Sequence, residues 1–194
     1  MPVAEGIPLV LNKLVGSDIR ALRKSRGITL SELSGVLGRS VGWLSQVERG
    51  HATPSIPDLA AIAAHFGVNI SFFFRAAGQR PEERGLIVRA ADRTAIGSQA
   101  HGLVEELLSP TLGGSFEMIK STFAPRSSSG GLKPSRKAED GGVLIAGRLT
   151  LRIGDLEVML ETGDSFQFVE QQYGWRNDHD EPAVAIWIVS PPIY

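Results

Sequence analysis

The apolar residues of this chain change their spacing near residue 80, which restricts the fold to a helical part followed by a β-rich part. Before residue 80, apolar residues recur at helical spacing between short turns. After it, short apolar runs are separated by Gly, Pro and Asp, as in strands. The segment AAGQRPEERG between them is typical of a linker. The sequence therefore predicts a helical domain over residues 12–75, a linker over 76–85 and a β domain over 86–194.

Composition is that of a water-soluble globular protein. The 194 residues are 42% hydrophobic and 21% charged, and none is cysteine, which excludes disulfides and thiolate metal sites. No apolar run reaches the roughly 18 to 20 residues of a membrane span. The start MPVAEGIPLVLNKL carries Glu5 and no basic residue before its apolar part, unlike a signal peptide. We expect a cytoplasmic protein with no membrane partner.

Charge is distributed unevenly along the chain. Nine Lys and Arg and five Asp and Glu precede residue 81, so the net charge of −1 divides into +4 for this part and −5 for the remainder. A basic part beside an acidic part indicates a polyanionic partner for the first part alone. Random variation accounts for a net charge of +4 equally well, so charge alone does not establish such a partner. The pattern of residues on the helices has to distinguish the two explanations.

The helical part contains short helices with recognisable ends. Thr29 and Glu32 form a capping box, and Ser40 and Ser55 are N-cap residues of two further helices. Glycine, which commonly ends helices, follows each apolar stripe. With a last short turn over NISFFFR, the pattern predicts about five helices, and the limits of the first four are Ser17 to Gly27, Thr29 to Gly38, Ser40 to Gly50 and Ser55 to Gly67.

Two of these helices are joined by only Gly38, Arg39 and Ser40, which is the length and turn of a helix-turn-helix. In the second of them, SVGWLSQVERG, Leu44 and Val47 form the apolar stripe. The side chains on the opposite face are small or able to form hydrogen bonds, whereas an ordinary surface helix carries Lys and Glu there. Such a face suits the major groove of DNA, which the second helix of the motif enters.

Residues 17 to about 74 resemble the XRE-type, or lambda-repressor-like, helix-turn-helix domain, an all-α bundle of five helices. The most specific part is LSQVERG followed by PS and a Leu-Ala-Ala helix. The resemblance implies that one set of residues contacts base edges, which specify the sequence, and that another contacts phosphates, which position the protein. The first set is Val41, Gly42, Ser45 and Gln46, and the second is Arg39, Ser40, Arg49, His51 and Thr53.

Alternatives remain open for this part. Trp43 either stacks on a partner or, as its spacing favours, packs against the bundle. Glu48 and Arg49 form a structural pair in one interpretation, in which Arg49 is not a phosphate contact. A bundle of this kind can also serve only as a protein contact. Such an adaptor would bind DNA weakly and without sequence preference.

The β part contains eight apolar runs separated by turn residues, which predicts a sandwich or a barrel. The order from GGVLIAG to YGWRND is similar to a cupin, an all-β double-stranded β-helix barrel. VLIAGRL resembles the first cupin motif, and LETGDSFQF with Asn177 resembles the second. The predicted strands are LIVRAADR, LVEELLS, SFEMIKSTFA, GGVLIAG, RLTLRIG, LEVMLE, DSFQFVE and AVAIWIVS.

Metal ligands are missing from the two cupin motifs. Metal-binding cupins supply two closely spaced His and a Glu from the first motif and a His from the second. With Glu139 at the Glu position, Lys133 and Ser135 stand where the two His belong, and Tyr173, or Gly174 in a register shifted by one, stands at the last. The four histidines provide no replacement: His51, His65, His101 and His179. We expect no metal and no cofactor.

The cupin resemblance also implies a small-molecule pocket between the sheets. Lys133, in place of a metal ligand, suits a carboxylate or another anion. In an equally open alternative, the candidate side chains are exposed or fill the barrel. The candidates are Lys133, Arg136, Glu139, Gln167, Tyr173 and Trp175.

Together the resemblances predict a sequence-specific transcriptional regulator that binds a palindromic operator as a homodimer, with the cupin as sensor and dimerisation domain. Its partners are then double-stranded DNA, a second copy of the chain and a small-molecule effector, and it is not an enzyme. The alternative is an oxygenase- or epoxidase-like cupin enzyme with an accessory helical domain. Lys133 and Ser135 disfavour that alternative, because its iron site needs two His.

Overall fold

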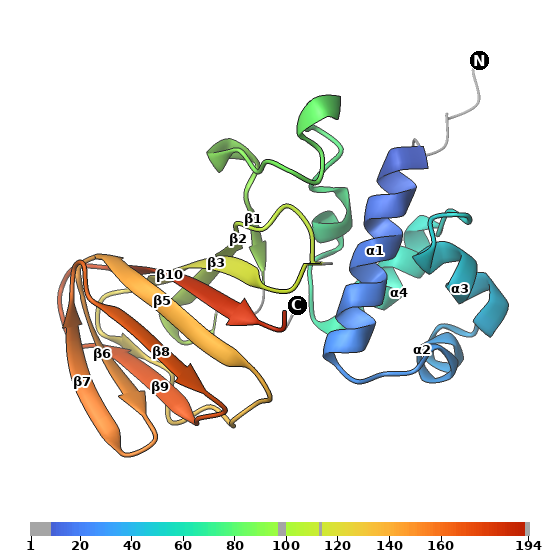
Figure 1. The fold of residues 1–194 in the computed structure, drawn as a ribbon. Coiled ribbons are helices and arrows are strands. Elements are labelled where there is room, and N and C mark those ends of the chain that lie inside the picture. The colour runs from blue at the N-terminus through green and yellow to red at the C-terminus, as the bar shows by residue number, and fades with distance from the viewer. Residues whose placement is uncertain (1–8, 97–99, 113, 193–194) are drawn as a thin grey trace. The chain divides into compact units, whose positions relative to one another are not determined.

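The computed structural model describes residues 9–96, 100–112 and 114–192, in two compact units (Figure 1). The first unit comprises the described residues up to Thr94 and those of the segment 109–114, and the second comprises those of 95–108 and 115–192. The first is helical and the second is built from antiparallel sheets, which confirms the predicted fold classes at this level. The domain limits at residues 75 and 86 remain predictions. No helix within the described ranges is long and apolar enough to cross a membrane.

Within its described residues the first unit has four α-helices: α1 (Leu9–Ser25), α2 (Leu30–Leu37), α3 (Val41–Glu48) and α4 (Ile56–Phe66). The predicted N-terminal ends of α2, α3 and α4 are confirmed. Thr29 and Glu32 form the capping box of α2, and the hydroxyls of Ser40 and Ser55 cap α3 and α4. Left-handed glycines end α2 and α4. Local sequence signals therefore place the helix-turn-helix.

The predicted start of the first helix near Ser17 is wrong, because α1 already includes Gly16 and the residues before it. Val15 and Ile19, four residues apart, are both buried on its inner side. Gly16 is retained inside the helix by close packing, since a Cβ at this position would lie 2.2 Å from the carbonyl oxygen of Val47. Gly16 is therefore a contact point between α1 and α3.

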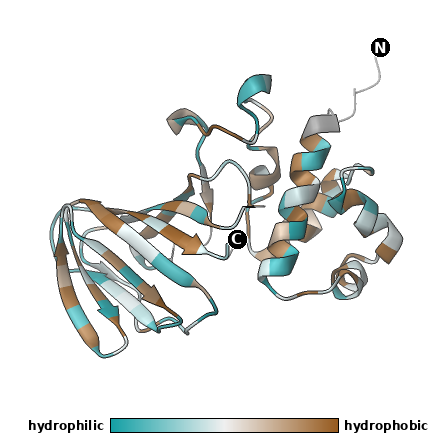
Figure 2. Cartoon of the chain, viewed as in Figure 1, coloured by the Kyte–Doolittle hydropathy of each residue, from teal (hydrophilic) through white to brown (hydrophobic). Residues whose placement is uncertain are grey.

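Ile70–Phe74 form the 3-10 helix η1, in the segment where a last short turn was expected as the fifth helix. A segment of five residues is too short to gain from helical cooperativity, and the burial of Phe72 and Phe73 holds it instead. Two more 3-10 turns follow, η2 (Pro81–Glu83) and η3 (Ala90–Asp92). Figure 2 shows hydrophobic and hydrophilic residues interspersed along α1, as expected of a helix with one buried face. The core of the unit includes Ile19, Leu22, Leu33, Leu44, Val47, Leu59, Ile62 and Phe72.

The second unit contains two antiparallel sheets. A six-stranded sheet has the order β1-β2-β3-β10-β5-β8, and a four-stranded sheet has the order β4-β9-β6-β7 (Figure 1). A 3-10 turn, η4 (Ala100–Gly102), precedes β2. The strands are β1 (Thr94–Ile96), β2 (Leu103–Leu107), β3 (Glu117–Phe123), β4 (Ser127–Ser128), β5 (Glu139–Ala146), β6 (Arg148–Ile153), β7 (Leu156–Glu161), β8 (Ser165–Val169), β9 (Tyr173–Asn177) and β10 (Ala183–Ser190).

Aromatic contacts connect the two sheets. The ring centres of Phe123 on β3 and Trp175 on β9 are 4.7 Å apart. Tyr173 on β9 lies 5.4 Å from both Phe168 on β8 and Trp187 on β10. All five side chains are buried. The hydrophobic core of the unit therefore lies between the sheets.

The strand predictions fail at one segment and miss three strands, which are β1, β4 and β9. LIVRAADR forms no strand: Leu86 and Ile87 are exposed, and Ala90–Asp92 form η3. This apolar run has no partner strand in the part of the chain that the structure describes. The spacing of apolar residues in a sequence does not show whether such a partner exists. β4 pairs with β9. The other predicted segments all contain strands.

Candidate functional site

Helix α3 presents a small and hydrogen-bonding face to solvent. Its inner side is fixed by Leu44 and Val47, which are fully buried. A Cβ on Gly42 would meet no atom within 4 Å, so glycine leaves open space on the outer side. The predicted base-contacting residues lie away from the core, with Val41, Gly42 and Gln46 exposed and Ser45 half-buried.

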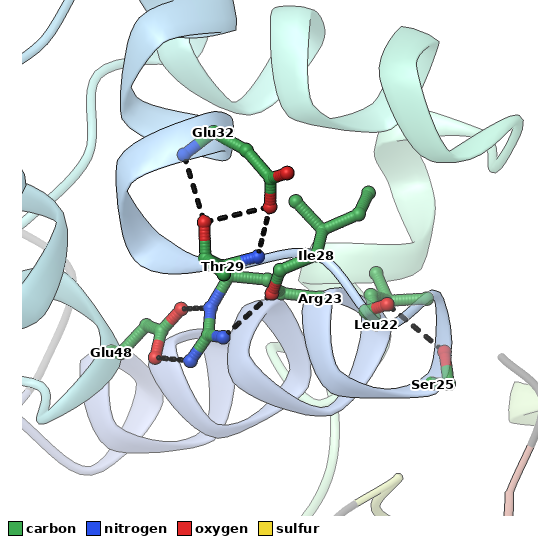
Figure 3. Close-up of polar contacts among 7 residues, drawn as sticks. All are labelled: Leu22, Arg23, Ser25, Ile28, Thr29, Glu32 and Glu48. Atoms are coloured by element: carbon green, nitrogen blue, oxygen red, sulfur yellow. Dashed lines mark hydrogen bonds and ion pairs between the residues drawn. The ribbon is translucent and has the colours of Figure 1, made fainter.

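A buried ion pair fixes α3 to α1. Nε and Nη2 of Arg23 donate to the two carboxylate oxygens of Glu48 at 2.6 and 2.9 Å, and Nη1 donates to the carbonyl oxygen of Ile28 at 2.9 Å (Figure 3). The two side chains are only 11% and 5% exposed. The hydrogen bonds to Glu48 raise the pKa of Arg23, although burial opposes this. Glu48 thus pairs with Arg23 rather than with Arg49, which is exposed.

A second ion pair fixes the turn before α3. Nε and Nη2 of Arg39 lie 2.9 and 3.2 Å from the carboxylate oxygens of Asp58, and the guanidinium carbon lies 5.1 Å from the ring centre of Trp43. Burial would raise the pKa of Asp58, but hydrogen bonds from Ser55 and Arg39 hold it below its ordinary value. The Arg39 side chain is still 47% exposed. It is therefore both anchored and accessible to a phosphate.

Ser40, another predicted phosphate contact, caps the start of α3, and the segment after α3 contributes the other three. Arg49, His51 and Thr53 are all exposed. The amide of Asn12 donates to the hydroxyl oxygen of Thr53 at 2.8 Å, which leaves the hydroxyl proton available. His51 Nδ1 lies 3.2 Å from Oε1 of Gln46. The structure therefore brings the predicted DNA contacts together on α3 and the two turns that flank it.

In the second unit, three predicted pocket residues come together. Nζ of Lys133 and the guanidinium carbon of Arg136 lie 5.6 and 5.5 Å from the ring centre of Tyr173. Arg136 also pairs with the buried Asp140, which accepts a hydrogen bond from Nε1 of Trp187 at 2.9 Å. Burial raises the pKa of Tyr173 although Arg136 opposes this, so the phenol keeps its proton. No ion pair of Lys133 is found within the described ranges.

The other three predicted pocket residues lie apart from this cluster. Glu139 and Gln167 are exposed and hydrogen-bonded to each other. Trp175 is buried next to Phe123, and its Nε1 has no hydrogen-bond partner in the part of the chain that the structure describes. The predicted set is therefore divided between a half-buried cluster around Tyr173, the aromatic core and the surface.

Asp140 and Trp187, which are buried next to this cluster, were not predicted. The signal was present in the alternation of strand residues, because side chains at successive positions point to opposite faces. In β5, Glu139 is exposed and Asp140 is buried. In β10, every second residue from Ala183 is buried, and Trp187 belongs to this set.

A cleft of about 180 Å³ lies at the four-stranded sheet. Of the predicted pocket residues it includes Trp175 alone. Separately, no group of three or more His, Asp and Glu in the described ranges could hold a metal ion, and the absence of a metal remains a prediction. The cleft is lined by Ser128, Ser129, Gly131, Leu132, Thr150, Arg152, Glu157, Gly174, Trp175 and Arg176.

A family model and a similar regulator agree with the assignment of α2 and α3 to a helix-turn-helix. The model of a helix-turn-helix domain family matches residues 14–70. The transcriptional regulator ClgR of Mycobacterium tuberculosis is 35% identical over 81 residues, which cover 42% of this chain and 72% of that protein. The HTH-type transcriptional regulator PuuR of Escherichia coli is 22% identical over 152 residues, 78% of this chain and 80% of that protein. A solved HTH_3 family transcriptional regulator from Vibrio cholerae is 22% identical and covers 95% of this chain and 98% of its own, with a TM-score of 0.46.

Proposed function

Because the chain belongs to the helix-turn-helix transcriptional regulators and is thus a DNA-binding regulator, we propose that it binds a palindromic operator as a homodimer in the cytoplasm. The outer face of α3 carries this proposal. Its small and hydrogen-bonding side chains fit a major groove, while the buried pair of Arg23 and Glu48 gives the helix a fixed orientation. A two-fold dimer places its two recognition helices about 34 Å apart, one turn of DNA, which requires a palindrome.

In this proposal, α3 reads bases and the flanking turns hold phosphates. The amide of Gln46 pairs with adenine through two hydrogen bonds, and the methyl groups of Val41 contact a thymine methyl. Ser45 and the open space at Gly42 permit close approach to the groove floor. Arg39 and Arg49 meet phosphates, since both are exposed cations next to α3. Contacts to phosphate then position the helix and contacts to bases select the operator.

Gln46→Ala is expected to weaken binding to the operator by about 1–3 kcal/mol and to relax the preference at one base pair of each half-site. The operator is first recovered by selecting genomic fragments that the protein binds at about physiological salt, where nonspecific binding is weak. Binding to single-base variants of that operator then gives the preference. Arg49→Ala is the matched control, because loss of a phosphate contact weakens all sequences alike. An equal loss on every sequence in Gln46→Ala would contradict base reading.

We further propose that the second unit is a cupin barrel that dimerises and senses a small anion. The cluster of Lys133, Arg136 and Tyr173 supports this site. Arg136 is already paired with Asp140, whereas Lys133 is a cation with no ion pair in the described ranges. A carboxylate would pair with the ammonium group and accept a hydrogen bond from the protonated phenol of Tyr173. An effector regulates only if it binds one conformation of the dimer better than the other.

Lys133→Ala is expected to abolish the response of operator binding to an anionic effector, without changing DNA affinity in its absence. Operator binding is measured with and without a series of small carboxylates, in wild type, Lys133→Ala and Lys133→Arg. The Arg variant keeps the charge and should retain part of the response. If Lys133→Ala leaves the titration unchanged, Lys133 does not belong to the effector site.

An oxygenase- or epoxidase-like activity is not proposed. Such an enzyme requires iron held by two His and a carboxylate, and Lys133 and Ser135 occupy the positions of the two His in the motif. The regulators to which the chain is similar also support a non-enzymatic role.

A further inference from the structure

Directly after α3, the chain turns back onto the helix. Gly50 has a φ of 72°, and a Cβ on it would lie 2.8 Å from the Cα of Lys13, so glycine is needed for its conformation and for the close approach. The turn brings the N–H groups of His51 and Ala52 to the carbonyl oxygen of Gln46 at 2.9 and 3.3 Å. The backbone thus holds residue 51 against residue 46.

The side chains of the same two residues also meet. Nδ1 of His51 lies 3.2 Å from Oε1 of Gln46, and both side chains are exposed. With its proton on Nδ1, His51 donates to that oxygen. Among the residues that the structure describes, both N–H groups of the Gln46 amide and a second lone pair of Oε1 have no other partner. These are the groups that an amide uses to bond adenine, one donor to N7 and one acceptor for N6.

We propose that His51 is a positioning residue that orients the amide of Gln46 for base recognition, instead of serving as a phosphate contact. The inference rests on the proposed function, in which Gln46 reads a base. An unrestrained glutamine loses rotamer freedom when it binds. A hydrogen bond formed before binding reduces that loss, and it holds the amide oxygen and nitrogen in one of their two possible orientations.

Two substitutions separate positioning from phosphate binding. His51→Leu removes the donor and keeps an apolar side chain. His51→Asn removes the ring and any positive charge but retains a donor, because the amide nitrogen of Asn is as many bonds from the backbone as Nδ1 of His. Both are made in the full chain, alone and combined with Gln46→Ala. Thermal unfolding of each variant confirms that the fold is retained.

The experiment measures binding to the selected operator and to its variant at the base pair that Gln46→Ala identifies. His51→Leu is expected to lower the preference between these two sites about three- to tenfold, which is the effect of one hydrogen bond. His51→Asn is expected to keep most of the preference. In the Gln46→Ala background, both substitutions should have no effect on it, because there is no amide left to orient.

Three results would overturn the inference. One is an unchanged preference in His51→Leu. Another is an equal weakening of binding to both sites in His51→Leu and His51→Asn, which is the behaviour of a phosphate contact. The third is a Gln46→Ala protein with the same base preferences as wild type, and this outcome removes base reading by Gln46 from the proposed function as well. Loss of the His51 effect alone leaves the proposed function intact.

Discussion

Glu48→Ala is expected to lower the free energy of unfolding by about 3–5 kcal/mol, the range measured when one partner of a buried ion pair is removed. The guanidinium of Arg23, whose side chain is only 11% exposed, would keep its bond to the carbonyl oxygen of Ile28 but lose both bonds to Glu48 (Figure 3). Water cannot easily replace the carboxylate there. Thermal or urea unfolding of the full chain, followed through helix content, measures the change.

The matched control replaces both partners together. Arg23→Met with Glu48→Leu removes both charges and fills the site with apolar side chains, so the double variant should recover most of the stability. The single variants Arg23→Met and Glu48→Leu, the double variant and the wild type form a double-mutant cycle. Its coupling energy measures the interaction between the two side chains. A Glu48→Ala protein as stable as wild type would show that the ion pair does not hold α3. We also expect Glu48→Ala to weaken operator binding, because α3 would lose its orientation.

The helix-turn-helix could be predicted in detail because its signals act over three or four residues. The capping box of Thr29 and Glu32 and the cap at Ser40 each satisfy the backbone of a helix that starts there. The exposed face of α3 follows from helical period once Leu44 and Val47 are recognised as buried. Each of these features is independent of the rest of the fold.

The anchoring of α3 could not be predicted, since it joins positions that are distant in the sequence. Arg23 and Glu48 are 25 positions apart. Charge pattern alone offered Arg49 as the partner of Glu48, but adjacent residues on a helix point in different directions. Only the packing of α1 against α3 decides which arginine faces the carboxylate.

Only some of the residues predicted for a pocket in the β unit lie together, for a related reason. A motif match places a residue along a strand, but a shift of one position moves its side chain to the other face of the sheet. Tyr173 falls on the inner face, whereas Glu139 falls on the outer face and its neighbour Asp140 is buried. Lys133, Arg136 and Tyr173 therefore lie together as a group, but the carboxylate beside them belongs to Asp140 and not to Glu139. That this group forms an effector site stays a prediction.

Gly16 shows how packing between helices can oppose local propensity. Within a helix, alanine is more favourable than glycine by about 1 kcal/mol, so propensity alone predicts that Gly16→Ala stabilises α1. The structure predicts the opposite. The new Cβ would lie 2.2 Å from the carbonyl oxygen of Val47 and 3.1 Å from that of Glu48, and both atoms belong to the backbone of α3. Relief of this overlap requires the two helices to separate.

Gly16→Ala is therefore expected to destabilise the chain by about 3 kcal/mol, the upper part of the range for overpacking, and to weaken operator binding by displacing α3. The matched control is Gly35→Ala in α2, where a Cβ meets no atom within 4 Å. That substitution should stabilise the chain by about 0.5–1 kcal/mol through helix propensity alone. Denaturant unfolding of both variants gives the comparison. Equal stabilisation by the two alanines would mean that α1 and α3 do not approach as closely as the structure requires, and the orientation of α3 toward DNA would then need another cause.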